Sequence, residues 1–291
     1  MRRQFRDTVG ALAAEDERVV VILGDVSVYQ FFAFKQAHPT RFHNMGICEP
    51  TLISVTAGMS ARGLHPFVHT IAPFLTERCF EQIKLDMGYN RFGGNIVTCG
   101  ASFDYAWDGA THHAYYDLPL LRLIPGMEVI QPGSEHEVDV LMRSQYANGR
   151  PTYFRLSDHP HDLDLGPVRF GEALVLRDEG APVTVMTAGP LVATVLEGCR
   201  DLSVNLVTHH TLKPIDRATV ARFRDTAILV VHDGHGLREA INEVGGLRTA
   251  YHGLEDDFVG GYGTVHDVRA ALGLDPAGIR AAVTRFAEEM S

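Results

Sequence analysis

Cysteine is scarce in this chain, with four copies in 291 residues. Cys48, Cys79, Cys99 and Cys199 lie far apart, and they form neither a Cys-x-x-Cys pair nor a spacing typical of a zinc site. The sequence therefore argues against a disulfide framework and against a cysteine zinc site. We expect reduced, mostly buried thiols, as in a cytoplasmic protein.

Long apolar runs and an excess of basic residues are also missing. No apolar run approaches the ~20 residues that a membrane span requires. The stretch "MRRQFRDTVGAL" has no continuous apolar core, so we expect no signal peptide. The chain has 26 Lys and Arg against 36 Asp and Glu, a net charge of −10, whereas nucleic-acid binding needs a basic face. We expect a cytoplasmic protein that binds neither membranes nor nucleic acid.

Several common catalytic motifs are absent, since the sequence contains no Walker loop, GxGxxG, GxSxG or HExxH. Histidine, by contrast, is abundant, with 15 copies. His209 and His210 are adjacent and would point to opposite faces of a strand, and Pro66 interrupts the pair His65 and His69. These pairs favour hydrogen-bonded or solvated histidines, and we expect no metal ligands in this chain.

Apolar patterns typical of strands and of helices alternate along the chain. Buried strands are expected at residues 18–23, 65–70, 95–100, 127–133, 152–156, 182–189, 204–210 and 226–234. Helices are expected at residues 3–14, 134–146, 191–199, 216–223 and 237–245, from Pro73 with Leu75, Cys79, Ile83 and Met87 on one face, and at the chain end with Ile279, Val283, Phe286 and Met290 on one face. This alternation predicts an α/β fold with parallel, doubly wound sheets.

Local signals add a cap and a linker to this prediction. Ser134 and Glu137 predict a capping box at the start of helix 134–146. Residues 157–171 are rich in Pro, Gly, Asp and His and predict a linker. We therefore expect two doubly wound α/β domains, residues 1–165 and a smaller domain of residues 166–291.

Polar residues gather where strands are expected to end, which is where open α/β sheets bind ligands. The stretch "DYAWDGATHHAYYD", residues 104–117, holds three aspartates, two histidines, three tyrosines and the single tryptophan. It is either an ordinary polar loop with a turn at Asp108-Gly109 or a loop that contacts a ligand. Glu49, the acid of "NMGICEP", precedes a largely uncharged segment and is either a paired core residue or a functional acid.

Four segments, in this order and spacing, carry a family resemblance. They are "RVVVILGDVS", "FHNMGICEP", "HPFVHTIAPFLTERCFEQIKLDM" and "DGATHHAYYDLPLLRLIPGMEVIQP". Together they resemble the pyrimidine-binding domain of the transketolase and deoxyxylulose-phosphate synthase family. The later "KPID", "GGYG" and final helices are similar to the C-terminal domain of that family. The resemblance implies thiamine diphosphate and Mg²⁺ as cofactors.

The resemblance also implies which residues surround the cofactor. Glu49 matches the glutamate that hydrogen-bonds a nitrogen of the aminopyrimidine ring and promotes its active tautomer, a task that suits a carboxyl in an apolar pocket. Ile71 and Phe74 match aromatic positions that wall the ring, and Ile71 gives up stacking energy on the order of 1 kcal/mol. Asp25 matches an aspartate near the cofactor, although Gly-Asp after a strand is also a routine turn. Pro50 replaces a glutamine and suits a helix start.

For the substrate, His112 matches the histidine of the family's DG-x-TH motif, and an acid–base role is natural to imidazole. Asp108 matches the acid that reads a substrate hydroxyl. Transketolases hold a sugar phosphate with a histidine and an arginine, and these positions are Gly100 and Asp158 here. Because Asp158 would repel a phosphate, we hypothesise a substrate that is unphosphorylated or cationic at that end.

A phosphate held elsewhere is the alternative, and the residues available for it are Arg155 and the pair Arg2/Arg3. Arginine suits this role because its planar fork matches the geometry of phosphate oxygens.

The largest departure from the family is the lack of a GDG motif, which the family uses to hold the magnesium diphosphate in a separate domain. We therefore expect the second half of a split transketolase, with a partner subunit that holds most of the metal and diphosphate. An α2β2 assembly that includes a self-dimer is expected. The expected reaction transfers a two-carbon ketol unit from a sugar-like ketose to an aldehyde. The alternatives are a decarboxylating carboligase, a 2-oxo acid dehydrogenase β-type subunit and a catalytically silent partner subunit.

Overall fold

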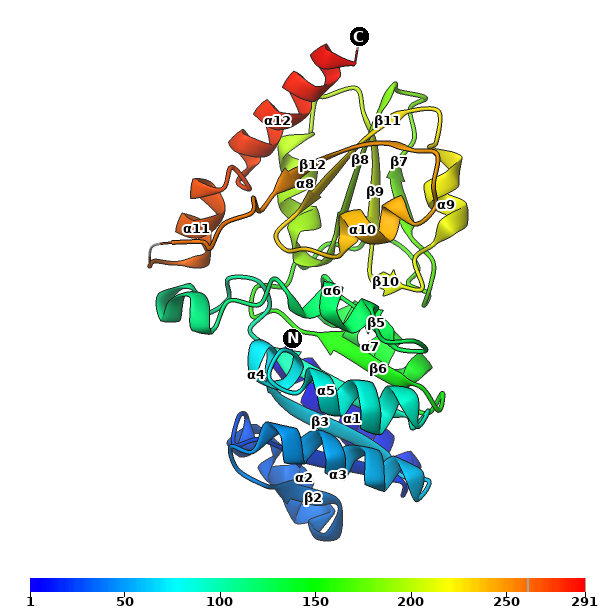
Figure 1. Ribbon diagram of the computed structural model, residues 1–291, viewed down its shortest axis with the longest axis vertical. Coiled ribbons are helices and arrows are strands. Elements are labelled where there is room, and N and C mark those ends of the chain that lie inside the picture. Colours follow the sequence, from blue (N-terminus) through cyan, green and yellow to red (C-terminus); the bar gives the residue numbers. More distant parts are fainter. Residues whose placement is uncertain (261, 291) are drawn as a thin grey trace.

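Two β-sheets flanked by helices make up the fold in a computed structural model that describes residues 1–260 and 262–290. Figure 1 shows the sheets one above the other, with the N-terminal half of the chain below and the C-terminal half above. Both sheets are mainly parallel, which confirms the predicted α/β class. Gly261, within the "GGYG" stretch, lies outside the described residues.

The first sheet has seven strands in the order β10-β5-β6-β4-β3-β1-β2. Their bounds are β1 (Val19–Leu23), β2 (Phe42–Asn44), β3 (His65–Ile71), β4 (Gly94–Cys99), β5 (Glu128–Ile130), β6 (Pro151–Arg155) and β10 (Thr211–Lys213). β10 comes from the C-terminal half of the chain, yet it pairs with β5 in antiparallel orientation. One strand from beyond residue 165 thus belongs to the first sheet. The domain division at residue 165 stays a prediction.

The second sheet has five strands in the order β12-β11-β8-β9-β7. Their bounds are β7 (Leu174–Arg177), β8 (Val183–Ala188), β9 (Asn205–His209), β11 (Ala227–His232) and β12 (Arg248–Gly253). The sequence did not predict β2, β7, β10 and β12. These strands are either three residues long or only partly buried, so they lack the continuous apolar run that marks a buried strand.

Helices pack on the sheets and carry the rest of the regular structure. The α-helices are α1 (Arg2–Glu15), α2 (Phe32–Ala37), α3 (Glu49–Ala61), α4 (Ala72–Thr76), α5 (Phe80–Gln82), α6 (Asp117–Arg122), α7 (Glu135–Gln145), α8 (Val192–Gly198), α9 (Arg217–Arg222), α10 (Leu237–Asn242), α11 (Val265–Ala271) and α12 (Pro276–Glu289). Helices of other types are the π-helix η3 (Ile83–Tyr89) and the 3₁₀-helices η1 (Val28–Phe31), η2 (Pro39–Arg41), η4 (Ala106–Thr111) and η5 (Gly189–Leu191). In α12 the predicted face is buried except for Met290, which caps the helix and is 41% exposed.

The segment that begins at Pro73 is not the single α-helix that its apolar stripe predicts. The four residues of the stripe are all buried: Leu75, Cys79, Ile83 and Met87. They run through α4, α5 and the π-helical η3 instead. The amide of Arg78 donates to the carbonyl of Pro73, five residues back, and the Cys79 thiol donates to the carbonyl of Phe74. These wide turns break the α-helical ladder and still turn the stripe inward.

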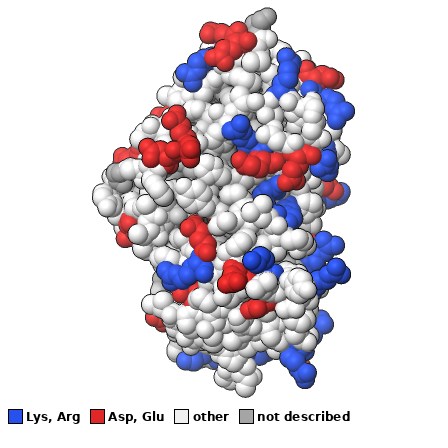
Figure 2. Space-filling model, viewed as in Figure 1, with Lys and Arg blue, Asp and Glu red and all other residues white. Residues whose placement is uncertain are grey.

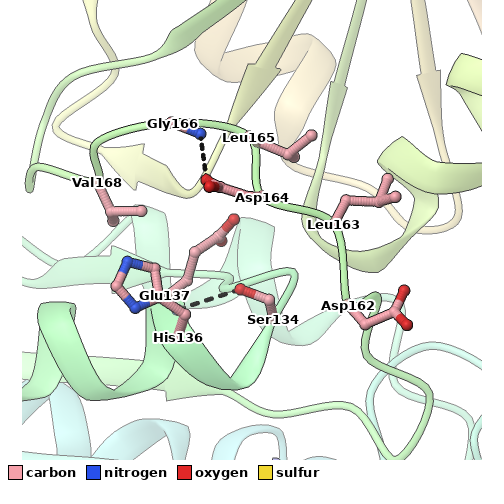
Figure 3. Close-up of a pocket in the computed structure, with 9 residues that line it drawn as sticks. All are labelled: Ser134, His136, Glu137, Asp162, Leu163, Asp164, Leu165, Gly166 and Val168. Carbon is pink, nitrogen blue, oxygen red and sulfur yellow. Dashed lines mark hydrogen bonds between the residues drawn. The ribbon is translucent and has the colours of Figure 1, made fainter.

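Residues 157–171, the predicted linker, connect β6 with β7 and pass the start of α7. A hollow of about 260 Å³ lies there, and Figure 3 shows the residues that line it. Ser134 caps α7 by accepting a hydrogen bond from the amide of Glu137. The Glu137 carboxylate accepts from the amide of Gly133, at 2.7 Å, and not from that of Ser134. The predicted hydrogen bond from the Ser134 amide to the Glu137 carboxylate, which is half of the capping box, is therefore wrong. The buried amide of Gly133 donates to this carboxylate instead.

Charged side chains of both signs occur over both halves of the face seen in Figure 2. Within the described residues, no helix is long and apolar enough to cross a membrane. No group of three or more His, Cys, Asp or Glu side chains in this part of the chain is placed to hold a metal ion. All four cysteines are free thiols, and Cys79, Cys99 and Cys199 are buried, as the sequence predicted.

We expect Glu137→Gln to stabilise the protein increasingly as the pH rises from about 4.5 to about 7, with the full gain above neutral pH. Burial raises the pKa of Glu137 to about 7 from its ordinary 4.5, so the folded state holds this proton more tightly than the unfolded state. The wild type therefore loses stability as the pH rises through this range, while the variant stays neutral. Thermal unfolding should show a midpoint about 2–4 °C higher for the variant near pH 8, and little gain below about pH 4.5.

Glu197→Gln is the matched control, because Glu197 is an exposed acid on α8. Its unfolding midpoint should follow that of the wild type at both pH values. An equal gain for Glu137→Gln at both pH values would contradict the prediction.

Candidate functional site

Glu49 lies in the first turn of α3, which follows β2 and so starts at the carboxyl edge of the first sheet. Pro50 comes next, as predicted for a helix start. The Glu49 residue is 3% exposed, and its Oε2 lies 3.0 Å from Nη1 of Arg78. A buried carboxylate needs a compensating charge, and Arg78 supplies it.

Arg78 also connects Glu49 to an aromatic wall. Its guanidinium carbon lies 4.5 Å from the centroid of the Phe74 ring. The Phe74 ring in turn meets the His112 ring edge-on, with 5.0 Å between centroids. Ile71 ends β3 and forms the N-cap of α4, three residues before Phe74. The structure thus joins the predicted site residues Glu49, Phe74 and His112 in one series of contacts through Arg78 and the Phe74 ring.

The polar stretch predicted to bind a ligand forms a loop after β4, residues 101–116, which we call the site loop. Asp108 lies exposed in η4, and His112 follows η4 and is half-buried. Gly109 interrupts η4 with φ of 70°, a conformation that favours glycine. Nδ1 of His112 is 2.9 Å from the hydroxyl of Thr111. This contact orients the imidazole and makes Nε2 the nitrogen available for proton exchange.

Asp104 is a buried acid at the base of the site loop, 2% exposed. Its carboxylate accepts hydrogen bonds from the Ala101 amide at 3.0 Å, the Asp158 amide at 2.8 Å and the Ser157 hydroxyl at 2.9 Å. Burial is the main cause that raises the pKa of Asp104 to about 7. The sequence analysis assigned no role to Asp104, whereas in the structure it joins the site loop to the segment after β6.

Arg155 lies in the core, contrary to the expectation that it is available to a substrate. It is 1% exposed, and its Nε donates to Asp117 at 2.8 Å. Its Nη1 donates to the Ser102 hydroxyl at 3.1 Å, and its Nη2 donates to the Ala114 carbonyl. All three guanidinium nitrogens are thus bonded within the protein, which removes Arg155 from the surface that a substrate can reach.

Arg2 and Asp158 form a two-pronged ion pair, with Nε–Oδ1 at 3.0 Å and Nη2–Oδ2 at 2.9 Å. Both side chains are partly exposed. The pair borders a hollow of about 830 Å³ between the start of α1 and the segment after β1. The hollow is lined by Met1, Arg2, Arg3, Arg6, Tyr29, Gln30, Glu135, Asp158 and Pro160. Asp158 therefore neutralises Arg2, one of the arginines expected to hold a phosphate.

Asp25 lies on the surface at the end of β1, where it pairs with Asn44 at the end of β2. The Asn44 amide donates to Oδ1 of Asp25, and the backbone amide of Asp25 donates to Oδ1 of Asn44, both at 3.0 Å. The φ of Asp25 is 66°, a left-handed conformation in which aspartate is enriched. This geometry is that of a turn, and the expected cofactor contact of Asp25 stays a prediction.

These residues fit a flat heteroaromatic ring that carries a weakly basic nitrogen. Glu49 offers a buried carboxylate, Phe74 and Ile71 offer apolar walls, and His112 offers an imidazole. The sequence analysis missed Arg78, although a signal was present. Phe74 and Arg78 are four residues apart in a helical segment, the spacing at which side chains on one face meet.

Comparison with known proteins identifies a family that is similar to this chain. Residues 1–159 match the family described as the transketolase pyrimidine binding domain. This match covers more than half of the chain and includes Glu49, Phe74 and the whole site loop.

Three relatives illustrate the similarity. A transketolase family protein of Sinorhizobium fredii is 31% identical over 91% of this chain and 83% of its own length. A 6-deoxy-6-sulfo-D-fructose transketolase subunit of a Clostridium species is 29% identical over 76% of this chain and 71% of its own length. The 1-deoxy-D-xylulose-5-phosphate synthase of Albidiferax ferrireducens is 31% identical over 87% of this chain, but the match spans only 42% of the synthase.

Among solved structures, a split-gene transketolase described as an inactive β4 tetramer is similar with a TM-score of 0.87 and 29% identity. The similarity covers 98% of this chain and 97% of that chain, so it extends over both sheets. The matching family, the relatives and the site geometry lead to one conclusion: the chain belongs to the transketolase family and carries its pyrimidine-binding domain.

Proposed function

We propose that this chain is the pyrimidine-binding subunit of a two-component, thiamine diphosphate-dependent enzyme of transketolase type. The reaction transfers a two-carbon ketol unit from a ketose donor to an aldehyde acceptor. The observation that carries the proposal is the Glu49 carboxylate, 3% exposed, within the cluster that contains Phe74 and His112. Thiamine diphosphate, when bound, supplies a nucleophilic carbon that no side chain provides.

Glu49 would share a proton with a ring nitrogen of the cofactor. Its burial favours this contact, because a hydrogen bond is stronger in the low dielectric of the protein interior than in water. Arg78 limits the cost of the buried negative charge. Ile71 and Phe74 would wall the ring and exclude water from the shared proton.

His112 and Asp108 would contact the substrate. The imidazole of His112 is held at Nδ1 by Thr111, so its Nε2 would donate and accept the proton at the oxygen of the donor carbonyl or hydroxyl. Asp108 is exposed in η4, four residues before His112. It would accept a hydrogen bond from the neighbouring substrate hydroxyl.

The substrate end beside Asp158 would carry no phosphate. The Asp158 carboxylate already occupies the fork of Arg2, and this carboxylate would have to move before a phosphate could replace it. The hollow of about 830 Å³ beside the pair has room for the tail of a sugar-like molecule. We therefore propose unphosphorylated, hydroxyl-bearing ketoses as donors.

A partner subunit would supply the diphosphate-binding half and most of the Mg²⁺ ligands. Three observations support this part of the proposal: the lack of a GDG motif, the match to less than half of a curated synthase, and the likeness to a chain from a split-gene transketolase. The structure of that chain is described as an inactive tetramer of β chains. We propose an α2β2 assembly in which two copies of the present chain pair with each other.

Decarboxylating carboligation is the second candidate function, and the likeness to 1-deoxy-D-xylulose-5-phosphate synthase favours it. The two reactions differ in the donor, a ketose in one and a 2-oxo acid in the other. Release of carbon dioxide from pyruvate by the assembled enzyme, without ketol transfer from ketoses, would replace the first proposal with the second.

Glu49→Gln should abolish ketol transfer by the assembled enzyme and leave its fold intact. The amide keeps the shape of the side chain but cannot share a proton with the ring nitrogen as a carboxyl does. We expect a loss in kcat on the order of 10²–10⁴-fold, measured as ketol transfer with thiamine diphosphate, Mg²⁺ and the co-purified partner present. Circular dichroism should match the wild type.

Glu81→Gln is the matched control, since Glu81 is an exposed acid in the first turn of α5. It should retain full activity. Full activity of Glu49→Gln would sink the assignment of Glu49, and a complex without ketol transfer even for the wild type would sink the proposed reaction.

The wild-type complex should prefer unphosphorylated ketoses, and Asp158→Ala should reduce that preference. The substitution frees the Arg2 guanidinium from its partner, and a charge-assisted hydrogen bond to a phosphate contributes about 1.5–3 kcal/mol. We therefore expect kcat/KM for a phosphorylated ketose to rise by roughly tenfold or more, at 1.4 kcal/mol per tenfold. A wild-type preference for phosphorylated ketoses would contradict this prediction.

A further inference from the structure

Arg155 fastens the base of the site loop. Ser102 and Ala114 pair across that base as an antiparallel bridge. The Arg155 guanidinium donates to the hydroxyl of Ser102 and to the carbonyl of Ala114. Its Nε donates to Asp117, directly after the loop, and the hydroxyl of Tyr153 donates to the same carboxylate at 2.5 Å. One buried side chain thus joins both ends of the site loop.

The C-terminal half of the chain continues this charge cluster. Asp233 follows β11 and is 2% exposed, and its Oδ2 lies 2.6 Å from Nη2 of Arg269 on α11. Burial acts to raise the pKa of Asp233, but the nearby cations, Arg269 first among them, outweigh burial and hold the pKa well below its usual range. Arg155 contributes to this effect from the first sheet. Alternating charges therefore run from Asp117 through Arg155 and Asp233 to Arg269.

Arg269 also acts on the site loop itself. Asp104, at the base of the loop, is buried, and the positive charge of Arg269 lowers its pKa against the larger effect of burial. The contact that Arg269 makes is with Asp233, and its effect on Asp104 is the smaller one. Because Asp233 is buried, moving the Arg269 guanidinium would leave its carboxylate unpaired, which gives Arg269 a defined position.

Apolar contacts follow the same route between the two halves. Figure 1 shows the orange helix α11 close to the green loop that follows β4. The shared apolar cluster consists of Phe103, Ala106, Tyr115, Leu254, Val265 and Val268. The carbonyl of Tyr115 accepts from the amide of His235 at 3.1 Å, and the Tyr116 ring stacks on the His235 ring at an angle of 13°. The base of the site loop is thus packed on the C-terminal half.

The tip of the site loop is far less constrained. Asp108 is exposed, Trp107 is 59% exposed, and His112 is half-buried. The hydroxyl of Thr111 donates to the carbonyl of Asp108 and lies beside the ring of His112, and both contacts stay within the tip. Outside the site loop, the His112 ring meets the Phe74 ring edge-on. Apart from this ring contact, the position of the tip relative to Glu49 depends on how its base is held.

We propose that Arg269 is a positioning residue: together with Asp233 it holds the base of the site loop, so that His112 and Asp108 face the substrate. The effect on His112 and Asp108 in catalysis rests on the proposed function. The proposal assigns the C-terminal half of the chain a role in the reaction. A shift of about 1 Å in a catalytic group costs on the order of 100-fold in rate, so an anchor remote from the cofactor acts through geometry.

The first test uses the chain alone and needs no activity. Trp107 is the single tryptophan of the chain and lies in the tip of the site loop, so its fluorescence reports on that loop. Arg269→Met removes the charge and keeps most of the side-chain length. We expect stronger quenching of Trp107 by acrylamide and lower fluorescence anisotropy than in the wild type. Arg269→Lys keeps a positive charge and should restore part of both values.

Arg222→Met is the matched control, because Arg222 pairs with Asp178 on the surface of the same half of the chain. Its Trp107 fluorescence should equal that of the wild type. Circular dichroism and thermal unfolding check that each variant folds. If Arg269→Met does not fold, Asp233→Asn makes the same comparison, because it removes the negative charge at almost unchanged shape.

The second test uses the complex assembled with its partner, thiamine diphosphate and Mg²⁺. A misplaced His112 should lower kcat by about 10–100-fold, with a smaller change in KM for the donor ketose. Arg269→Lys should recover part of kcat, and Arg222→Met should match the wild type.

The outcomes separate this inference from the proposed function. Unchanged Trp107 quenching in Arg269→Met, relative to Arg222→Met, overturns the anchoring. Stronger acrylamide quenching of Trp107 in Arg269→Met, together with an unchanged kcat, overturns the positioning role. A wild-type complex that transfers no ketol unit overturns the proposed function and with it the positioning role, while the fluorescence comparison still decides whether Arg269 anchors the loop.

Discussion

Charge compensation in the protein interior is the constraint on which the candidate site depends. Three buried acids each face an arginine: Glu49 with Arg78, Asp117 with Arg155, and Asp233 with Arg269. Removal of one partner from a buried pair costs about 3–5 kcal/mol, because the remaining charge is uncompensated. Exposed pairs contribute about 0–1 kcal/mol. The pairs Asp117–Arg155 and Asp233–Arg269 therefore fix the site loop and α11 more strongly than the exposed tip residues fix one another. The pair of Glu49 is weaker, because the Arg78 side chain is 47% exposed.

The same constraint shapes the substrate end of the site. Arg2 and Asp158 are partly exposed, so their pair is weaker than the buried ones and is open to competition from solvent or ligand. Its two parallel hydrogen bonds nevertheless give it a defined geometry. Because Asp158 completes the fork of Arg2 from within the chain, this part of the hollow presents a neutral pair where an unpaired arginine would favour an anion. Asp158 thus occupies one of the three arginines that line the hollow.

Much of the fold follows from the sequence, because buried parallel strands such as β1, β4, β8 and β11 are continuous apolar runs. The short strand β10 could not be predicted, since its place in the first sheet depends on a tertiary contact with β5. The apolar stripe after Pro73 gave the correct buried residues but the wrong helix type. Burial depends on which face points inward, whereas the π-helical turns of η3 depend on backbone bonds that the stripe does not specify.

For the site, the residue types were predictable and their partners were not. Glu49, Phe74 and His112 were found through motifs, and the structure brings them together. Arg155 was named as an alternative phosphate ligand because its planar fork suits phosphate oxygens, but its partner Asp117 lies 38 residues away and holds it in the core. A sequence shows charges without their pairing, and pairing decides whether an arginine binds a ligand or holds a loop.

Pairing also bears on the departure at Ile71, where an aliphatic side chain forgoes stacking energy on the order of 1 kcal/mol. The remaining wall, Phe74, is held between the guanidinium of Arg78 and the ring of His112. A cation over an aromatic face contributes about 0.5–1 kcal/mol at an exposed site, and it also restricts the ring before a ligand arrives. A wall ordered in advance loses less conformational entropy on binding. The contacts of Phe74 thus offset part of what Ile71 forgoes.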